Sequence, residues 1–103
     1  MILTVLWTRE ASDTFDDRIA YLQKHFSQRE INNFKARVEA YLDTLSQKPF
    51  IGKQTGKNKN VHIGLIIPPV SLVYRIKESN HTIELISFFD NRQDPKKLKK
   101  YTG

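Results

Sequence analysis

The sequence predicts an α+β domain, in which an antiparallel helical hairpin packs on a mainly antiparallel four-stranded sheet and a short helical turn follows. Two observations lead to this fold class. Apolar residues at helical spacing fill the first half of the chain, and three strand-like apolar runs separated by turn signals fill the second half. With 103 residues the chain has room for one modest core, so we expect a single domain over residues 1–103.

The chain opens with a short apolar run, Ile2 to Trp7, which we expect to be the first strand. This run has no basic stretch ahead of it and is too short for a signal peptide. No apolar run reaches the roughly 18–20 residues that a membrane span needs. Cysteine is absent, which excludes disulfides and cysteine-ligated zinc. We therefore expect a cytoplasmic protein that does not contact a membrane.

Two helices are predicted next, and together they should form a hairpin over residues 9–46. Thr8 can cap the first helix, whose apolar stripe is Ala11, Phe15, Ile19, Leu22 and Phe26. Ser27-Gln28-Arg29-Glu30 has the pattern of a capping box that starts a second helix. The second stripe is Ile31, Phe34, Val38, Leu42 and Leu45. Lys48-Pro49 ends this helix, because the residue before a proline disfavours helical geometry.

The second half of the chain reads as a loop, three strands and a basic turn. We expect a loop over Phe50–Asn60, followed by strands at Val61–Ile67, Ser71–Lys77 and Thr82–Phe89. The middle run alternates, so it should be half-buried with Ser71, Val73 and Arg75 on an outward, functional face. The last run is apolar on both faces apart from two residues, as a central strand would be. Asp94-Pro95 is typical of a helix start, here of a short lysine-rich helix.

Positive charge is concentrated in the middle third of the chain. The net charge is +6, and the segment 44–77 contains no acidic residue beside its six cations, Lys48, Lys53, Lys57, Lys59, Arg75 and Lys77. Such a distribution predicts an electropositive patch for RNA, DNA or an acidic protein. A solvated lysine-rich loop that only keeps the protein soluble is the open alternative.

The available chemistry is that of arginine and lysine. The three histidines, His25, His62 and His81, are scattered and should be surface residues, so no metal site is expected. We expect no cofactor either. Arg75 and Arg92 are the candidate catalytic cations, because each could stabilise a phosphate during metal-free RNA cleavage and both should reach one edge of the sheet. No general acid or base is evident beside them. Arg75 could instead be a plain strand residue, and Arg92 could pair with Asp90 or Asp94.

Residues near these arginines complete the predicted binding surface for a protein target or a nucleic acid. They are basic or amide side chains on the loop, the strand ends and the terminal turn: Lys53, Lys57, Lys59, Lys77, Asn91, Lys96 and Lys97. Loop residues held by a rigid scaffold are where function tends to lie.

Several motifs together resemble the RelE/ParE superfamily of bacterial toxins. Tyr74-Arg75-Ile76 matches a "YR-V" strand of that superfamily, and Arg92-Gln93-Asp94 matches its terminal "R-D" pair. Trp7-Thr8 at the first strand end and Pro49 shortly before Gly52 fit in order and spacing. The resemblance covers nearly the whole chain. It implies a growth-inhibiting toxin of a type II toxin–antitoxin system, with an antitoxin that we expect to be acidic and partly disordered.

The superfamily contains two branches with different targets. RelE-like toxins cut mRNA on the ribosome and carry an arginine three residues before the strand tyrosine, where this chain has Ser71. They also carry a basic, Tyr or His group near the C-terminus, and Tyr101 lies far from Arg92 in the sequence. ParE-like toxins inhibit DNA gyrase by protein contact and resemble the end of this chain more closely. We therefore predict a ParE-like, non-enzymatic toxin. A ribosome-dependent mRNA endonuclease and a harmless nucleic-acid-binding module remain the alternatives.

Overall fold

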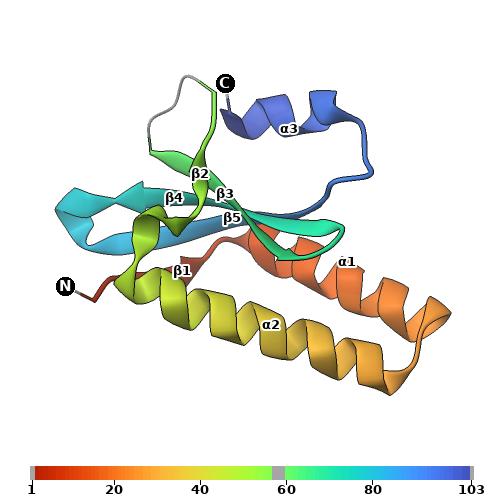
Figure 1. Ribbon diagram of the computed structural model, residues 1–103. Coiled ribbons are helices and arrows are strands. Elements are labelled where there is room, and N and C mark those ends of the chain that lie inside the picture. The colour runs from red at the N-terminus through yellow and green to blue at the C-terminus, as the bar shows by residue number, and fades with distance from the viewer. Residues whose placement is uncertain (1, 57–59, 103) are drawn as a thin grey trace.

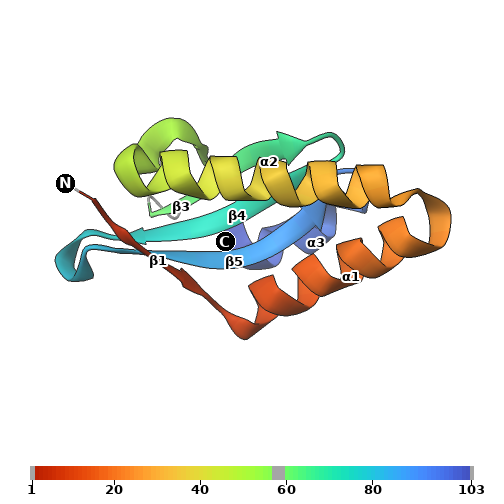
Figure 2. The same cartoon turned by 90° about the horizontal axis from the view of Figure 1, so that it is seen from below.

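The protein consists of a sheet with a helical hairpin on one face and a short terminal helix on the other (Figures 1 and 2). The computed structural model describes residues 2–56 and 60–102. The strands are β1 (Thr4–Trp7), β2 (Lys53–Gln54), β3 (Val61–Ile67), β4 (Val70–Lys77) and β5 (Thr82–Asp90). The helices are α1 (Arg9–His25), α2 (Gln28–Gln47) and α3 (Pro95–Thr102), with 3₁₀ turns at Pro49–Ile51 and Glu78–Asn80. None of the described helices is long and apolar enough to cross a membrane.

The sheet has five strands in the described part of the chain, one more than the sequence predicted. Their order is β1-β5-β4-β3-β2, with β1 parallel to β5 and the other pairs antiparallel. The additional strand is β2, which lies inside the predicted loop and pairs Lys53 with Ile63 of β3. Strand β1 begins later than predicted, because the backbone N–H of Leu3 bonds to the carbonyl oxygen of Ser46 at the end of α2.

Both predicted helix starts are confirmed by their caps. The Thr8 hydroxyl accepts a bond from the N–H of Ala11 (3.1 Å) and donates one to the carbonyl of Leu85 on β5 (2.7 Å). Thr8 therefore begins α1 and ties it to the sheet at the same time. The capping box of α2 is present, with the Glu30 carboxylate accepting from the N–H of Ser27 (3.0 Å). The Ser27 hydroxyl also donates to this carboxylate, and this side-chain bond is the main reason why the pKa of Glu30 is lowered.

The main core lies between the hairpin and the sheet. It contains the buried stripe residues of both helices and the inward residues of β4 and β5: Ala11, Leu22, Ile31, Phe34, Val38, Leu45, Leu72, Tyr74, Ile76, Ile83 and Leu85. The stripe prediction is wrong for one residue. Phe26 follows the end of α1 in extended conformation, and half of its surface is exposed (51%).

The opposite sheet face is covered, contrary to the prediction of an exposed functional face. Ser71 and Val73 are buried, with 4% and 0% of their surface exposed. Helix α3 lies over this face, and its Leu98 and Tyr101 pack against a second buried cluster that includes Val73. Arg75 and Lys77, closer to the end of β4, stay partly exposed. Both faces of β4 are therefore packed, despite the alternating pattern of its residues. Leu98 of α3 covers the face that was expected to contact solvent.

Candidate functional site

Arg92 lies just beyond β5 and is fixed by the last residue of that strand. Its guanidinium donates two bonds to the Asp90 carboxylate, Nε to Oδ1 (3.1 Å) and Nη2 to Oδ2 (2.8 Å), and its backbone N–H donates a third (2.8 Å). The salt bridge considered for Arg92 is thus confirmed, with Asp90 as its partner. The bonds from Arg92 lower the pKa of Asp90 and raise that of Arg92. The Arg92 side chain remains 60% exposed, so a partner can reach it.

A second arginine, Arg18 of α1, approaches the same carboxylate from the hairpin. Its Nη1 lies 3.6 Å from Asp90 Oδ2, and its guanidinium lies 4.9 Å from the centre of the Tyr21 ring. The Arg18 side chain is only 16% exposed, and its buried Nε has no hydrogen-bond partner among the described residues. Arg18 was not among the residues predicted from the sequence. Its spacing could have indicated a buried arginine. Arg18 lies three residues after Phe15 and four before Leu22, on the same face of the helix as the apolar stripe.

Two adjoining hollows open beside Arg18. One hollow of about 190 Å³ lies between α1 and the paired ends of β4 and β5, and Asp17 and Asp90 line it. The other, of about 230 Å³, lies between the tip of the hairpin and the β3–β4 turn. We call them together the Arg18 groove, and its defining residues are Arg18, Tyr21, Leu22, Phe26, Pro68 and Arg92.

Arg75 is not part of this site, so the prediction that Arg75 and Arg92 share an edge of the sheet is wrong. In the β4–β5 ladder Arg75 lies opposite Glu84, whereas Asp90 lies opposite Val70. The five positions from Val70 to Arg75 correspond to about 16 Å along the strand. Antiparallel pairing is the reason, because the end of β5 lies beside the beginning of β4. Arg75 is a strand arginine paired with Glu84 (3.2 Å).

The other predicted binding residues are dispersed. Lys77 also pairs with Glu84 (3.2 Å), so a single carboxylate partly neutralises two cations of the predicted positive patch. Asn91 donates from Nδ2 to the Ser71 hydroxyl (2.9 Å) and links the β5 end to β4. Exposed lysines lie on separate elements, Lys53 on β2 and Lys96 and Lys97 on α3. Lys57 and Lys59 lie outside the described residues.

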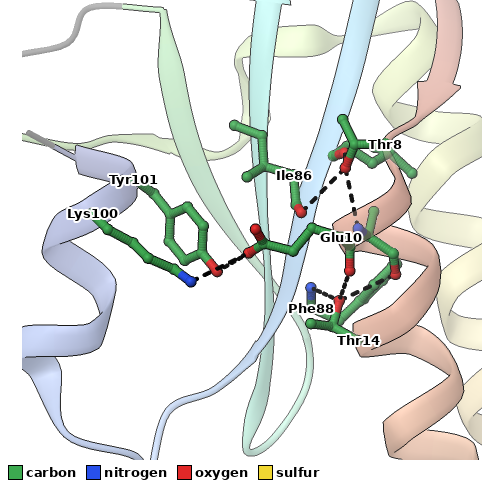
Figure 3. A network of polar contacts seen from close by, with 9 residues as sticks. Thr8, Glu10, Thr14, Ile86, Phe88, Lys100 and Tyr101 are labelled. Carbon is green, nitrogen blue, oxygen red and sulfur yellow. Dashed lines mark hydrogen bonds and ion pairs between the residues drawn. The ribbon is translucent and has the colours of Figure 1, made fainter.

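A second polar cluster joins α1 to α3 (Figure 3). The Tyr101 hydroxyl donates to the Glu10 carboxylate, and Nζ of Lys100 lies 3.8 Å from the same oxygen. A hydrogen bond between Lys100 and Tyr101, together with the negative charge of Glu10, raises the pKa of Lys100. These three side chains line a broad hollow of about 670 Å³ that also contains Lys97. Glu10 was not predicted from the sequence, and Tyr101 was considered only for its separation from Arg92, because Glu10 and Tyr101 lie about ninety positions apart in the chain.

The histidines divide into two kinds. His25 and His81 are exposed, as predicted. His62 is buried with 4% exposure, which contradicts the prediction, because its ring stacks on Tyr74 (centroids 5.6 Å apart) and Phe50 packs beside it. The described residues contain no group of three or more His, Cys, Asp or Glu side chains that could hold a metal ion.

Comparison with known proteins identifies the family. A sequence profile of the ParE toxin of the type II toxin–antitoxin system parDE matches residues 5–95. The chain belongs to the ParE toxin family. The RelE/ParE resemblance drawn from the sequence is thereby confirmed, and so is the assignment to toxins of type II toxin–antitoxin systems. A comparison with curated protein sequences gave no significant match.

Solved toxin structures share the fold of this ParE-family chain. The toxin–antitoxin complex RelBE2 from Mycobacterium tuberculosis is 20% identical, with a TM-score of 0.64 over 87% of this chain and 99% of that chain. The chromosomal ParDE system of P. aeruginosa is 16% identical, with a TM-score of 0.68 over 86% and 96%. The YoeB/ParE toxin from Agrobacterium tumefaciens is 16% identical, with a TM-score of 0.62 over 85% and 98%. The α+β fold class is therefore confirmed.

Proposed function

We propose that this toxin stops growth by binding DNA gyrase through the surface around Arg92, and that it does so without cleaving RNA. The observation that carries this proposal is the locked Asp90–Arg92 pair. A general base must accept a proton near neutral pH. The Asp90 carboxylate is a poor candidate, since Arg92 lowers its pKa and occupies both of its oxygens. A fixed and exposed guanidinium is instead well suited to a protein contact, where arginines often act as anchors.

The toxin is expected to act in the cytoplasm and to be held inactive there by a co-encoded antitoxin. The structural relatives include a RelBE2 toxin–antitoxin complex and a ParDE system, which supports such a partner. The net charge of +6 favours an acidic antitoxin. A partly disordered antitoxin could fold while it covers the toxin surface.

Brief expression in a bacterial host tests this proposal. We expect gyrase supercoiling activity to fall and the DNA-damage response to rise, while mRNA 5′ ends on translating ribosomes stay unchanged. Arg92→Ala should remove toxicity by weakening the contact with gyrase. Arg75→Ala is the matched control, because it removes an arginine whose register places it away from Arg92, and it should stay toxic. Toxicity that survives Arg92→Ala would show that the active surface lies elsewhere.

The second candidate function is mRNA cleavage on the ribosome, which the cluster of Glu10, Lys100 and Tyr101 favours. A carboxylate, a cation and a phenol are the groups that metal-free RNA cleavage needs as base, phosphate stabiliser and acid. Under this alternative, expression would produce cuts inside codons within minutes. Glu10→Gln would abolish these cuts, whereas Arg92→Ala would leave most of them. Absence of codon-phased cuts in the wild-type protein would exclude this candidate.

A further inference from the structure

We propose that the Arg18 groove is the docking site of the antitoxin, and that Arg18 binds a carboxylate of the docked segment while the groove takes an adjacent large apolar side chain. The identity of this partner rests on the proposed function.

Arg18 has a buried hydrogen-bond donor without a partner among the described residues. A guanidinium carries five N–H donors in a planar fork. Within the described residues, the contacts of Arg18 are an ion pair at 3.6 Å, too long for a hydrogen bond, and the face of the Tyr21 ring. Its Nε is completely buried and unpaired. Buried donors are nearly always satisfied in folded proteins, and an exception suggests a missing ligand or a functional role.

Two of the neighbouring acids, Asp90 and Glu30, already have hydrogen-bond partners. Asp90 gives both oxygens to Arg92. Glu30, which also lines the groove, accepts from the backbone and hydroxyl of Ser27. Asp17 is an exposed residue on the rim of the smaller hollow. A carboxylate that enters beside Arg18 would therefore meet two guanidinium groups, and planar bidentate pairing with carboxylate is what arginine does best.

The walls of the Arg18 groove are largely apolar. Phe26 and Tyr21 line the groove together with Pro68 of the β3–β4 turn, and in total they expose 51% and 36% of their surfaces. The larger hollow measures about 230 Å³. A dry cavity of about 150 Å³ suffices to hold benzene, so this hollow has room for a phenyl ring or a leucine side chain. An exposed aromatic pocket beside an arginine is the usual composition of a protein-binding hot spot.

The lining of the Arg18 groove favours a protein carboxylate over a nucleic-acid phosphate. A phosphate backbone would pass a row of negative charges along Asp17 and Asp90 and would leave the apolar walls unfilled. An acidic residue next to Leu or Phe in a polypeptide satisfies both halves of the groove. Arg92 lines the same groove. An antitoxin bound there would cover Arg92 and neutralise the toxin by blocking its contact surface.

The test titrates the isolated toxin with a small probe that combines both features, 3-phenylpropionate, and follows arginine Nε–Hε and aromatic resonances by NMR. A fragment of this size should bind with a Kd on the order of 1–10 mM and shift Arg18 and Phe26. The matched alcohol, 3-phenylpropanol, should bind at least about tenfold more weakly, because it lacks the charge that pairs with Arg18. Phenyl phosphate serves as the nucleic-acid-like probe.

Variants assign the effect to Arg18. Arg18→Gln should weaken 3-phenylpropionate binding by about tenfold, and Arg18→Lys, which keeps the charge but not the fork, by somewhat less. Arg37→Gln on the exposed face of α2 is the control and should bind as the wild type does. Should both Arg18 variants unfold, the comparison of the three probes on the wild-type protein still decides. Equal binding of acid and alcohol, preference for phenyl phosphate, or no saturable shift would each overturn the proposal.

The occupant is tested with the product of the open reading frame beside the toxin gene. This protein should displace 3-phenylpropionate and should bind Arg18→Gln more weakly than Arg37→Gln. A complex that forms while the probe stays bound would show that the antitoxin docks elsewhere, although the protein would still be a toxin. Failure of the proposed function looks different, because gyrase would remain active in cells that express the protein while the probe still binds the isolated groove.

Discussion

The hydroxyl of Tyr74 donates a hydrogen bond to the carbonyl oxygen of Pro49 (2.8 Å) and accepts one from the backbone N–H of Gly52 (2.9 Å). Tyr74 is completely buried in the middle of β4. Burial is also the main reason why its pKa is raised. This tyrosine of the "YR" motif therefore fixes the turn that leads from α2 into β2, and its role is structural.

Tyr74→Phe is expected to destabilise the fold by about 1–3 kcal/mol, because the Gly52 N–H and the Pro49 carbonyl lose their buried partner. Urea unfolding monitored by circular dichroism would measure the loss. Tyr21→Phe removes the hydroxyl of a tyrosine that is 36% exposed and whose polar partner is the exposed Arg92, so this variant should stay within about 0.5 kcal/mol of the wild type. Equal stability of the two variants would contradict the structural role of Tyr74.

Gly64→Ala should also destabilise the protein, for a steric reason. A Cβ at Gly64 would lie 1.5 Å from the Tyr41 hydroxyl and 2.4 Å from its ring carbon Cζ, so the Tyr41 ring would have to move. Overpacking of this kind costs about 1–3 kcal/mol. If the contact with Tyr41 is the cause, Gly64→Ala combined with Tyr41→Leu should cost less than the sum of the two single changes. Additive losses in thermal unfolding would show that another neighbour is responsible.

The sequence predicted the parts of the fold that local chemistry determines. The caps at Thr8 and Ser27 and the two apolar stripes predicted both helices, because capping and 3.6-residue spacing depend on neighbours in the chain. The short strand β2 was missed, since Lys53 and Gln54 have no strand pattern and are ordered by pairing with β3. The covered face of β4 was missed for a similar reason. Nothing within β4 shows that Leu98, twenty-five residues after Val73, packs over it.

The candidate site was predicted only in part. Arg92 and its pairing with Asp90 could be expected, because the two residues are neighbours in sequence. The approach of Arg18 depends on the way α1 crosses β5, and the separation of Arg75 from Arg92 depends on the antiparallel register of β4 and β5. Such long-range relations follow from strand order and register, and a single sequence does not specify these when the strands are apolar on both faces.

Asp90→Asn should make the stability of the protein less dependent on pH. The folded pKa of Asp90 is lowered, chiefly by its bonds with Arg92. Its contribution is therefore fully present above the unfolded value of about 3.9 and is lost as the pH falls through the lower folded value. Because Arg92 is largely exposed, we expect a difference of about 1 kcal/mol or less at pH 7. Unfolding free energies of wild type and variant should converge once the pH is below the lowered folded pKa of Asp90, and a difference that persists there would have another origin.

Glu10→Gln should loosen α3 from the rest of the molecule without unfolding it. Glu10 accepts a hydrogen bond from Tyr101 and pairs with Lys100, so one carboxylate holds the end of the terminal helix against α1. The pair with Lys100 is exposed and contributes little. The bond from Tyr101 is charge-assisted, and its replacement by a neutral amide should roughly halve its strength. Amide hydrogen exchange in α3 should then accelerate by about threefold to tenfold. This corresponds to a free energy of local opening that is lower by about 0.7–1.4 kcal/mol. Exchange in β4 and β5 should not change.

The control for this experiment is Glu39→Gln, which neutralises an exposed carboxylate on α2. It should leave exchange in α3 as it is in the wild type. Tyr101→Phe removes the donor of the same hydrogen bond, so exchange in α3 should be at least as fast as in Glu10→Gln. The double variant should then be no faster than Tyr101→Phe alone, since the bond can be lost only once. Faster exchange in the double variant would mean that Glu10 and Tyr101 stabilise α3 through separate contacts.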